Sequence, residues 1–137
     1  MDHCTHVSES DLAALAGSST VATLLPGAEF STRSTYPNAR RFLEAGVAIA
    51  VATDCNPGTS YVTSMGFVIA LAVREMGLTP DEALYAATRG GAAALRRSDV
   101  GHLGLGARCD LVVLNAPRAA HLAYRPGAHL VARTVRS

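Results

Sequence analysis

Two short clusters hold the residue types that could do chemistry. Asp54 follows a long apolar run, and the polar stretch 55–60 comes directly after it. A carboxylate at the end of a buried strand costs free energy unless it is paired, hydrogen-bonded or bound to a metal. Asp54 is therefore a candidate catalytic carboxylate or metal ligand. The residue types leave one alternative open, an Asp that caps a following helix.

The second cluster lies near the start of the chain and contains His3 and His6. Histidine serves both as an acid–base group and as a metal ligand, but His-x-x-His without a helix or strand around it is a weak metal motif. Cys55, next to Asp54, is a potential nucleophile. No Cys–His spacing supports that role, and the alternative is a small buried side chain.

An α/β pattern surrounds these clusters. Strands are predicted at 20–25 and 47–53, with a helix at 37–45 between them. The second run is apolar on both faces, which is typical of a parallel strand covered by helices. Strand, helix and strand with short links predict a βαβ unit. Functional residues collect at the carboxyl ends of such strands, which is where Asp54 falls.

The rest of the chain divides into helices and a β-rich tail. Further helices are predicted at 8–16, 61–75 and 80–88, the first and third from capping boxes. A loop is expected after Pro26-Gly27, and Gly90-Gly91 is expected to interrupt the third of these helices. Beyond residue 98 a glycine-rich stretch precedes short predicted strands at 111–114, 122–124 and 130–135.

Composition excludes several classes of protein. The 137 residues are 49% hydrophobic and only 17% charged, unlike a disordered chain. A net charge of +1 gives no basis for binding nucleic acid or an anionic membrane. The apolar runs are far shorter than the roughly 20 residues of a membrane-spanning helix. Three cysteines without CxxC spacing, and no visible signal peptide, favour a cytoplasmic protein.

Four stretches share motifs with known enzymes. Residues 52–60 read Ala-Thr-Asp-Cys-Asn-Pro-Gly-Thr-Ser, Asp2-His3 lies upstream, and 21–27 read Val-Ala-Thr-Leu-Leu-Pro-Gly. These three resemble the signature of the imidazolonepropionase family, metal-dependent amidohydrolases of histidine degradation. The glycine-rich stretch 101–114 resembles the C-terminal stretch shared by many amidohydrolases, although Cys109 stands where that pattern usually has Ala.

The resemblance implies an α/β fold. Residues 1–98 would be the C-terminal part of a (β/α)8 TIM-like amidohydrolase barrel, and residues 99–137 part of a small β-sandwich. Family members are much longer than this chain. We therefore expect the chain to be their C-terminal portion, and to be inactive without the N-terminal part.

The resemblance also implies a reaction, the hydrolysis of the ring C–N bond of 4-imidazolone-5-propanoate to N-formimidoyl-L-glutamate. Asp54 would be a catalytic residue that ligates the metal and accepts a proton. His3 would be catalytic by positioning or polarising water and substrate. The substrate-binding positions are Asn56, Gly58 and Thr59.

The implied cofactor is one divalent metal, Zn²⁺ or Fe²⁺. A catalytic zinc site needs about three protein ligands, and the family's other ligands lie upstream of this chain. The partners implied are a small-molecule substrate and, in the full-length enzyme, a second copy of the chain in a homodimer. Two alternatives stay open: another amidohydrolase, such as a deaminase, or a non-catalytic truncated remnant.

Overall fold

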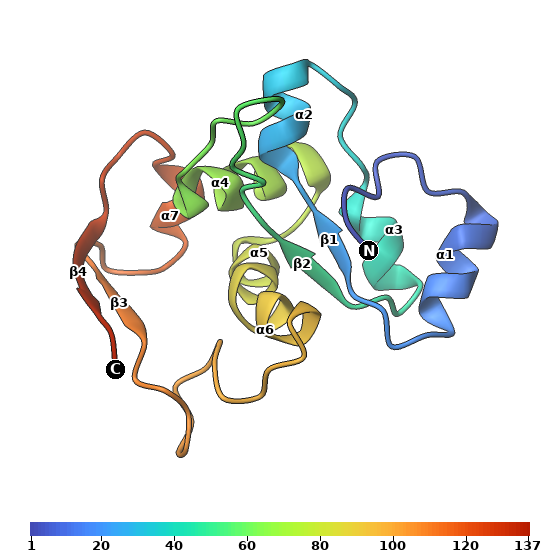
Figure 1. The fold of residues 1–137 in the computed structure, drawn as a ribbon. Helices are drawn as coiled ribbons and strands as arrows, with labels where there is room; N and C mark the ends of the chain where they lie inside the picture. The colour runs from blue at the N-terminus through green and yellow to red at the C-terminus, as the bar shows by residue number, and fades with distance from the viewer.

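The computed structural model describes all residues from 1 to 137 (Figure 1). The chain forms an α/β core followed by a small two-stranded sheet. No helix is both long and apolar enough to cross a membrane. In chain order the elements are α1 (Glu9–Ala16), β1 (Ala22–Leu24), α2 (Pro26–Thr32), α3 (Ala39–Glu44), β2 (Ile49–Val51), α4 (Met65–Met76), α5 (Pro80–Tyr85), the π-helical turn η1 (Ala86–Gly90), α6 (Gly91–Ala94), β3 (Leu111–Leu114), α7 (His121–Tyr124) and β4 (Val131–Val135).

A parallel sheet lies at the centre of the core. β1 and β2 pair in parallel, with Leu24 beside Val51, as the strand–helix–strand pattern predicts. Asp2 forms a further parallel bridge to Thr23 of β1, so the first residues of the chain lie along the other edge of β1. All three residues of β2 are buried. The prediction of a strand apolar on both faces is therefore confirmed.

Helices pack around this sheet and close the core. η1 and α6 contact the strands, and α4 contacts β2 as well as α2, α3 and α5. Phe42 of α3, Leu24 of β1, and Val68 and Met76 of α4 are almost fully buried. Burial of each such side chain stabilises the fold by about 1.5–3 kcal/mol.

Side-chain caps determine where two of the helices begin. Ser8 Oγ accepts from the Asp11 N–H at 3.2 Å, and the Asp11 carboxylate accepts from the Ser8 N–H at 3.0 Å. Thr79 and Glu82 form the same reciprocal pair at the start of α5. Both capping boxes were predicted, and both are confirmed. Gly90-Gly91 does not interrupt the helix, however, because α5, η1 and α6 are continuous.

Two predictions are wrong, one for the residues that follow β1 and one for the start of α4. The residues after β1 form α2 instead of a loop, because Pro26 occupies the first turn, where its missing N–H is harmless. The long helix begins at Met65 instead of residue 61. Ser64 sets that start, since its hydroxyl accepts from the Phe67 N–H at 3.2 Å.

The C-terminal segment differs in one element from the prediction. β3 and β4 pair antiparallel, which confirms strands at 111–114 and 130–135. The predicted strand at 122–124 is wrong: these residues belong to α7, which packs against α4 with Ala123 buried. The preceding Ala119-Ala120 favours helix. The β-sandwich and the domain boundary at residue 98 stay predictions.

The close approach of η1 to β2 predicts that Gly90→Ala destabilises the fold. A methyl group on Gly90 would lie 2.2 Å from the carbonyl oxygen of Ile49, so strand and helix must separate. We expect the free energy of unfolding to fall by about 3 kcal/mol, measured by urea denaturation. Gly91→Ala is the matched control, because its methyl group would be 4.0 Å from the nearest atom. Equal stability of the two variants would contradict this packing.

The ion pair between Arg40 and Glu82 predicts a pH-dependent stability. The Arg40 guanidinium, helped by the Thr79 N–H, lowers the pKa of Glu82 from 4.5 to about 2. Because the folded pKa is below the unfolded one, the stabilisation is complete above about pH 4.5 and is lost as pH falls through about 2. Glu82→Gln should cost about 0.5–1 kcal/mol at pH 7, since the pair is partly exposed.

Urea denaturation of both proteins between pH 7 and pH 2 measures this difference, which should shrink toward zero at the acid end. Asp81→Asn, one residue away in the same first turn and outside any ion pair, is the control. A difference that stayed constant down to pH 2 would show that the ion pair is not its source.

Candidate active site

The carboxyl ends of three parallel segments meet at one edge of the sheet. Asp2 pairs with β1, and β1 pairs with β2, all running in the same direction. His3 follows the first segment, Pro26 the second, and the loop with Asp54 follows β2. The topology therefore brings the two sequence clusters to the same end of the core, where parallel α/β folds collect functional groups.

His3 lies in a strained turn. Both His3 (φ 66°) and Cys4 (φ 58°) have left-handed backbone conformations, which cost L residues roughly 1–2 kcal/mol each. Cys4 closes the turn, with its N–H donating to the Asp2 carbonyl at 3.0 Å. Burial raises the pKa of the Cys4 thiol, so that this side chain stays protonated and packs in the core. The turn leaves the His3 side chain exposed.

Asp54 also has a left-handed backbone, with φ 49°. The residue is half-buried, and its carboxylate takes part in none of the hydrogen bonds or ion pairs of the chain. The capping alternative for Asp54 is wrong, because the next helix starts eleven residues later and is capped by Ser64. Both carboxylate oxygens are thus free for a ligand or a proton.

Asn56 organises the loop after β2. Its side-chain oxygen accepts from the backbone N–H groups of Gly58 and Thr59, both at 2.8 Å. Its side-chain NH₂ group donates to the carbonyl of Asp54 at 2.6 Å. Asn56 and Ser60 form a short antiparallel bridge that closes the loop. The Asn56 amide is therefore occupied within the chain, and its direct effect is to fix the three predicted site residues around it.

Ser60 joins this loop to α2, a role that the sequence analysis missed. The Ser60 side chain is 2% exposed, and its hydroxyl donates to the Thr53 carbonyl at 3.0 Å. On the other side, a methyl group on Gly27 would lie 3.0 Å from Ser60 Oγ and 3.1 Å from Val62 Cβ. The loops after β1 and β2 are thus packed together, and only glycine fits at position 27 without a shift.

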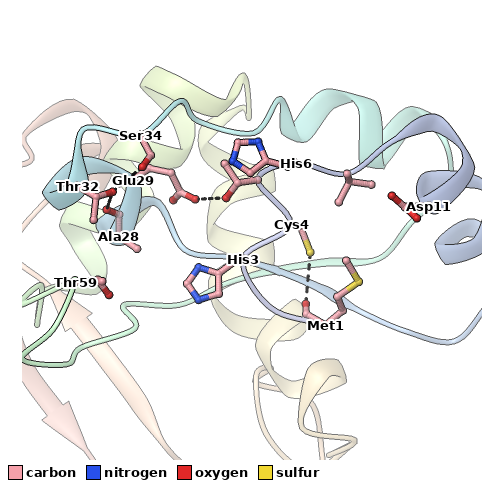
Figure 2. A pocket seen from close by; sticks show the side chains of 12 residues that line it. Met1, His3, Cys4, His6, Asp11, Ala28, Glu29, Thr32, Ser34 and Thr59 are labelled. Carbon is pink, nitrogen blue, oxygen red and sulfur yellow. Dashed lines mark hydrogen bonds between the residues drawn. The ribbon is translucent and has the colours of Figure 1, made fainter.

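A cavity of about 490 Å³ opens beside His3 (Figure 2). It brings together His3 and Thr59, two of the predicted site residues, and the His3 ring extends toward the side where Thr59 lies. Asp54, Asn56 and Gly58 are not part of its wall. The residues that line it are Met1, His3, Cys4, Thr5, His6, Val7, Asp11, Ala28, Glu29, Thr32, Ser34 and Thr59.

Glu29 is the second residue that the sequence analysis missed. It is 3% exposed, and its Oε1 accepts from the Thr5 hydroxyl at 2.6 Å. Its Oε2 is buried and has no hydrogen-bond partner. The available signal was the single charge in the stretch 21–30, where Thr23 is the only other polar side chain.

The chain does not by itself hold a complete metal site. No group of three or more His, Cys, Asp or Glu side chains lies close enough to bind one ion. The three cysteines are free; Cys4 is buried, and Cys55 and Cys109 are exposed, so the alternative of a buried side chain for Cys55 is wrong. What the chain does offer is the unpaired carboxylate of Asp54 at the end of β2, which can supply one ligand.

Comparison with known proteins gives consistent matches along the chain. The model of the amidohydrolase family matches residues 1–136. An imidazolonepropionase of Mycolicibacterium smegmatis is 66% identical over 136 residues, which are 99% of this chain and 34% of that protein. The chain therefore spans about a third of the length of this relative.

Two solved structures share the fold. Guanine deaminase of E. coli is 26% identical, with a TM-score of 0.73 over 95% of this chain and 32% of its own. An adenosine deaminase of Xanthomonas campestris, solved with bound zinc, is 23% identical, with a TM-score of 0.82 over 98% of this chain and 35% of its own. These α/β structures are consistent with part of a TIM barrel.

The hydrogen bonds of Asn56 predict that Asn56→Ala loosens the loop without unfolding the core. The N–H groups of Gly58 and Thr59 lose their acceptor, so their amide hydrogen exchange should accelerate, and the free energy of unfolding should fall by about 1 kcal/mol. Hydrogen-exchange NMR measures the first effect. Asn115→Ala is the control, because the exposed Asn115 side chain makes no hydrogen bond. Unchanged exchange at Gly58 and Thr59 would contradict the role of Asn56.

Proposed function

The chain belongs to the amidohydrolase family, and from that membership we propose that it is the C-terminal portion of an imidazolonepropionase. The reaction is hydrolysis of the ring C–N bond of 4-imidazolone-5-propanoate to N-formimidoyl-L-glutamate. The observation that carries the proposal is the 66% identity to the M. smegmatis enzyme along 99% of the chain. Because the chain covers only 34% of that protein, the activity is proposed for the whole enzyme.

Asp54 and His3 are the proposed catalytic residues. The Asp54 carboxylate has no partner in the chain and is free to take the proton that water gives up. His3 is presented by its turn toward the cavity that Thr59 also lines, where its imidazole can hydrogen-bond water or the substrate carbonyl.

The loop after β2 is the proposed substrate-binding segment. Gly58 and Thr59 contact the imidazolone or its propionate arm in this proposal. The exposed Thr59 hydroxyl lies beside the cavity, and the bond that it donates to Asn56 Oδ1 is long, at 3.4 Å, so a substrate acceptor can replace it. Asn56 contributes by holding both residues in place, since its own amide is already hydrogen-bonded.

The proposed cofactor is one divalent metal, Zn²⁺ or Fe²⁺, with Asp54 as one ligand. The residues of this chain do not fit a whole site, so the other ligands would come from the part of the relatives that the chain does not cover. When bound, such a metal supplies hydroxide near neutral pH and polarises the carbonyl. Bound zinc in the adenosine deaminase of the same fold supports a divalent metal.

A second candidate is another amidohydrolase activity, deamination of a purine. It is favoured by the fold shared with guanine and adenosine deaminases. The 23–26% identity to those two structures, against 66% to the imidazolonepropionase, supports the first proposal over this one. A cytoplasmic location and a homodimer of the whole enzyme stay predictions.

The decisive experiment joins this chain to the upstream two-thirds of the M. smegmatis enzyme, replacing the matching residues. The joined protein should hydrolyse 4-imidazolone-5-propanoate, whereas the chain alone should not. Activity on guanine or adenosine instead of 4-imidazolone-5-propanoate would favour the deaminase proposal. A folded protein with no activity on any of the three compounds would contradict both proposals.

Two substitutions in the joined protein separate the proposed roles. Asp54→Ala should remove most activity together with the metal, because a ligand is lost, whereas His3→Ala should remove activity and leave the metal bound. Elemental analysis and turnover measure the two effects. Asp81→Asn is the control, because it removes a carboxylate away from the site and should change neither activity nor metal content. Normal turnover of Asp54→Ala would contradict the catalytic assignment.

A further inference from the structure

Glu29 occupies a position that stability alone does not explain. The residue is 3% exposed, between the buried Ala28 and the exposed Phe30. One of its carboxylate oxygens is buried without any donor. Burial of an unsatisfied carboxylate oxygen opposes folding, and an apolar residue of similar size would pack there at lower cost. Such a residue invites a functional explanation.

The satisfied oxygen of Glu29 reaches across to the His3 turn. Glu29 Oε1 accepts from Thr5 Oγ1 at 2.6 Å, a contact between residues 24 positions apart. Thr5 comes directly after the left-handed pair His3 and Cys4. Figure 2 shows the Glu29 side chain extending from α2 toward the N-terminal segment, on the wall of the cavity that His3 also lines.

The turn is therefore held on both sides. Before it, the Met1 amino group donates to the Val21 carbonyl at 3.0 Å, and the Thr23 N–H donates to the Met1 carbonyl at 2.8 Å. After the turn, the hydrogen bond from the Thr5 hydroxyl to Glu29 holds the chain. A pair of left-handed residues persists only when the surroundings hold it. Without Glu29, the segment after His3 loses its side-chain bond to α2, and the turn keeps the bond from the Cys4 N–H to the Asp2 carbonyl.

Glu29 is itself fixed to the rest of the site. Its carbonyl accepts from the Ser34 N–H at 3.1 Å at the end of α2. The start of α2 is packed through Gly27 against Ser60, whose hydroxyl holds the end of β2 at Thr53. α2 therefore contacts both the segment after His3, through Glu29, and the loop that carries Asp54 and Thr59, through Gly27.

We propose that Glu29 is a positioning residue: through Thr5 it holds the left-handed turn that presents the His3 imidazole to the cavity. The proposal rests on the catalytic role proposed for His3, but its geometry is a property of this chain. It assigns a function to the one buried carboxylate of the core, and it explains why a residue that opposes folding is tolerated there.

The test is NMR of the 137-residue chain with ¹³C-labelled histidine rings. In Glu29→Leu and in Thr5→Val, the His3 ring resonances should move toward those of an unstructured peptide, while His102 and His129 stay in place. Glu29→Gln and Thr5→Ser keep an acceptor and a hydroxyl and should restore the wild-type His3 resonances. Thermal unfolding of Glu29→Leu should occur at the same or a higher temperature than in the wild type.

Glu82→Gln is the matched control, because it removes a carboxylate contact elsewhere in the chain. It should lower the melting temperature and leave His3 unmoved. Unchanged His3 resonances in both Glu29→Leu and Thr5→Val would overturn the proposal. So would a His3 shift equally large in Glu82→Gln, since general loosening would then explain it. Because no turnover is measured, failure of the proposed reaction is a separate outcome.

Discussion

Parallel pairing at the centre of the core is the constraint on which the rest depends. Because Asp2, β1 and β2 run in one direction, every segment that leaves the sheet at its carboxyl end leaves at the same edge. His3, α2 and the Asp54 loop are neighbours for that reason alone. Each connection between the parallel segments must run back to the opposite end of the sheet, which takes a helix-containing crossover. The helices that bury β2 are α4, η1 and α6, which follow it in the chain.

Beyond the carboxyl ends of the strands the hydrogen-bond ladder of the sheet stops, so side chains hold the loops in place. His3, Cys4 and Asp54 all have positive φ, and each such residue opposes folding slightly. Local hydrogen bonds offset that cost: Asn56 holds the Asp54 loop, and Thr5 with Glu29 holds the His3 turn. Three of the five non-glycine residues with positive φ therefore lie where chemistry is proposed, the other two being Arg33 and Arg96.

Features that depend on neighbours in sequence were predictable, and those that depend on distant contacts were not. The capping boxes at Ser8 and Thr79 and the buried run of β2 are local signals, and the structure confirms them. α7 was predicted as a strand because four residues carry little periodicity, and its packing on α4 decides its state. Glu29 was missed because its partner, Thr5, lies 24 residues away.

The two carboxylates of this edge show how environment assigns different tasks to the same group. Asp54 is half-buried, and both of its oxygens are free, so it suits a role that requires a changing partner, such as a metal or a proton. Glu29 is buried, and one of its oxygens already accepts a hydrogen bond from the Thr5 hydroxyl, so it suits a static role. A carboxylate that exchanges ligands must stay reachable, and one that holds a turn must exclude water from its bond. The two strands place the carboxylates differently. β2 ends in an open loop, which leaves Asp54 reachable, whereas β1 leads directly into α2, which buries Glu29.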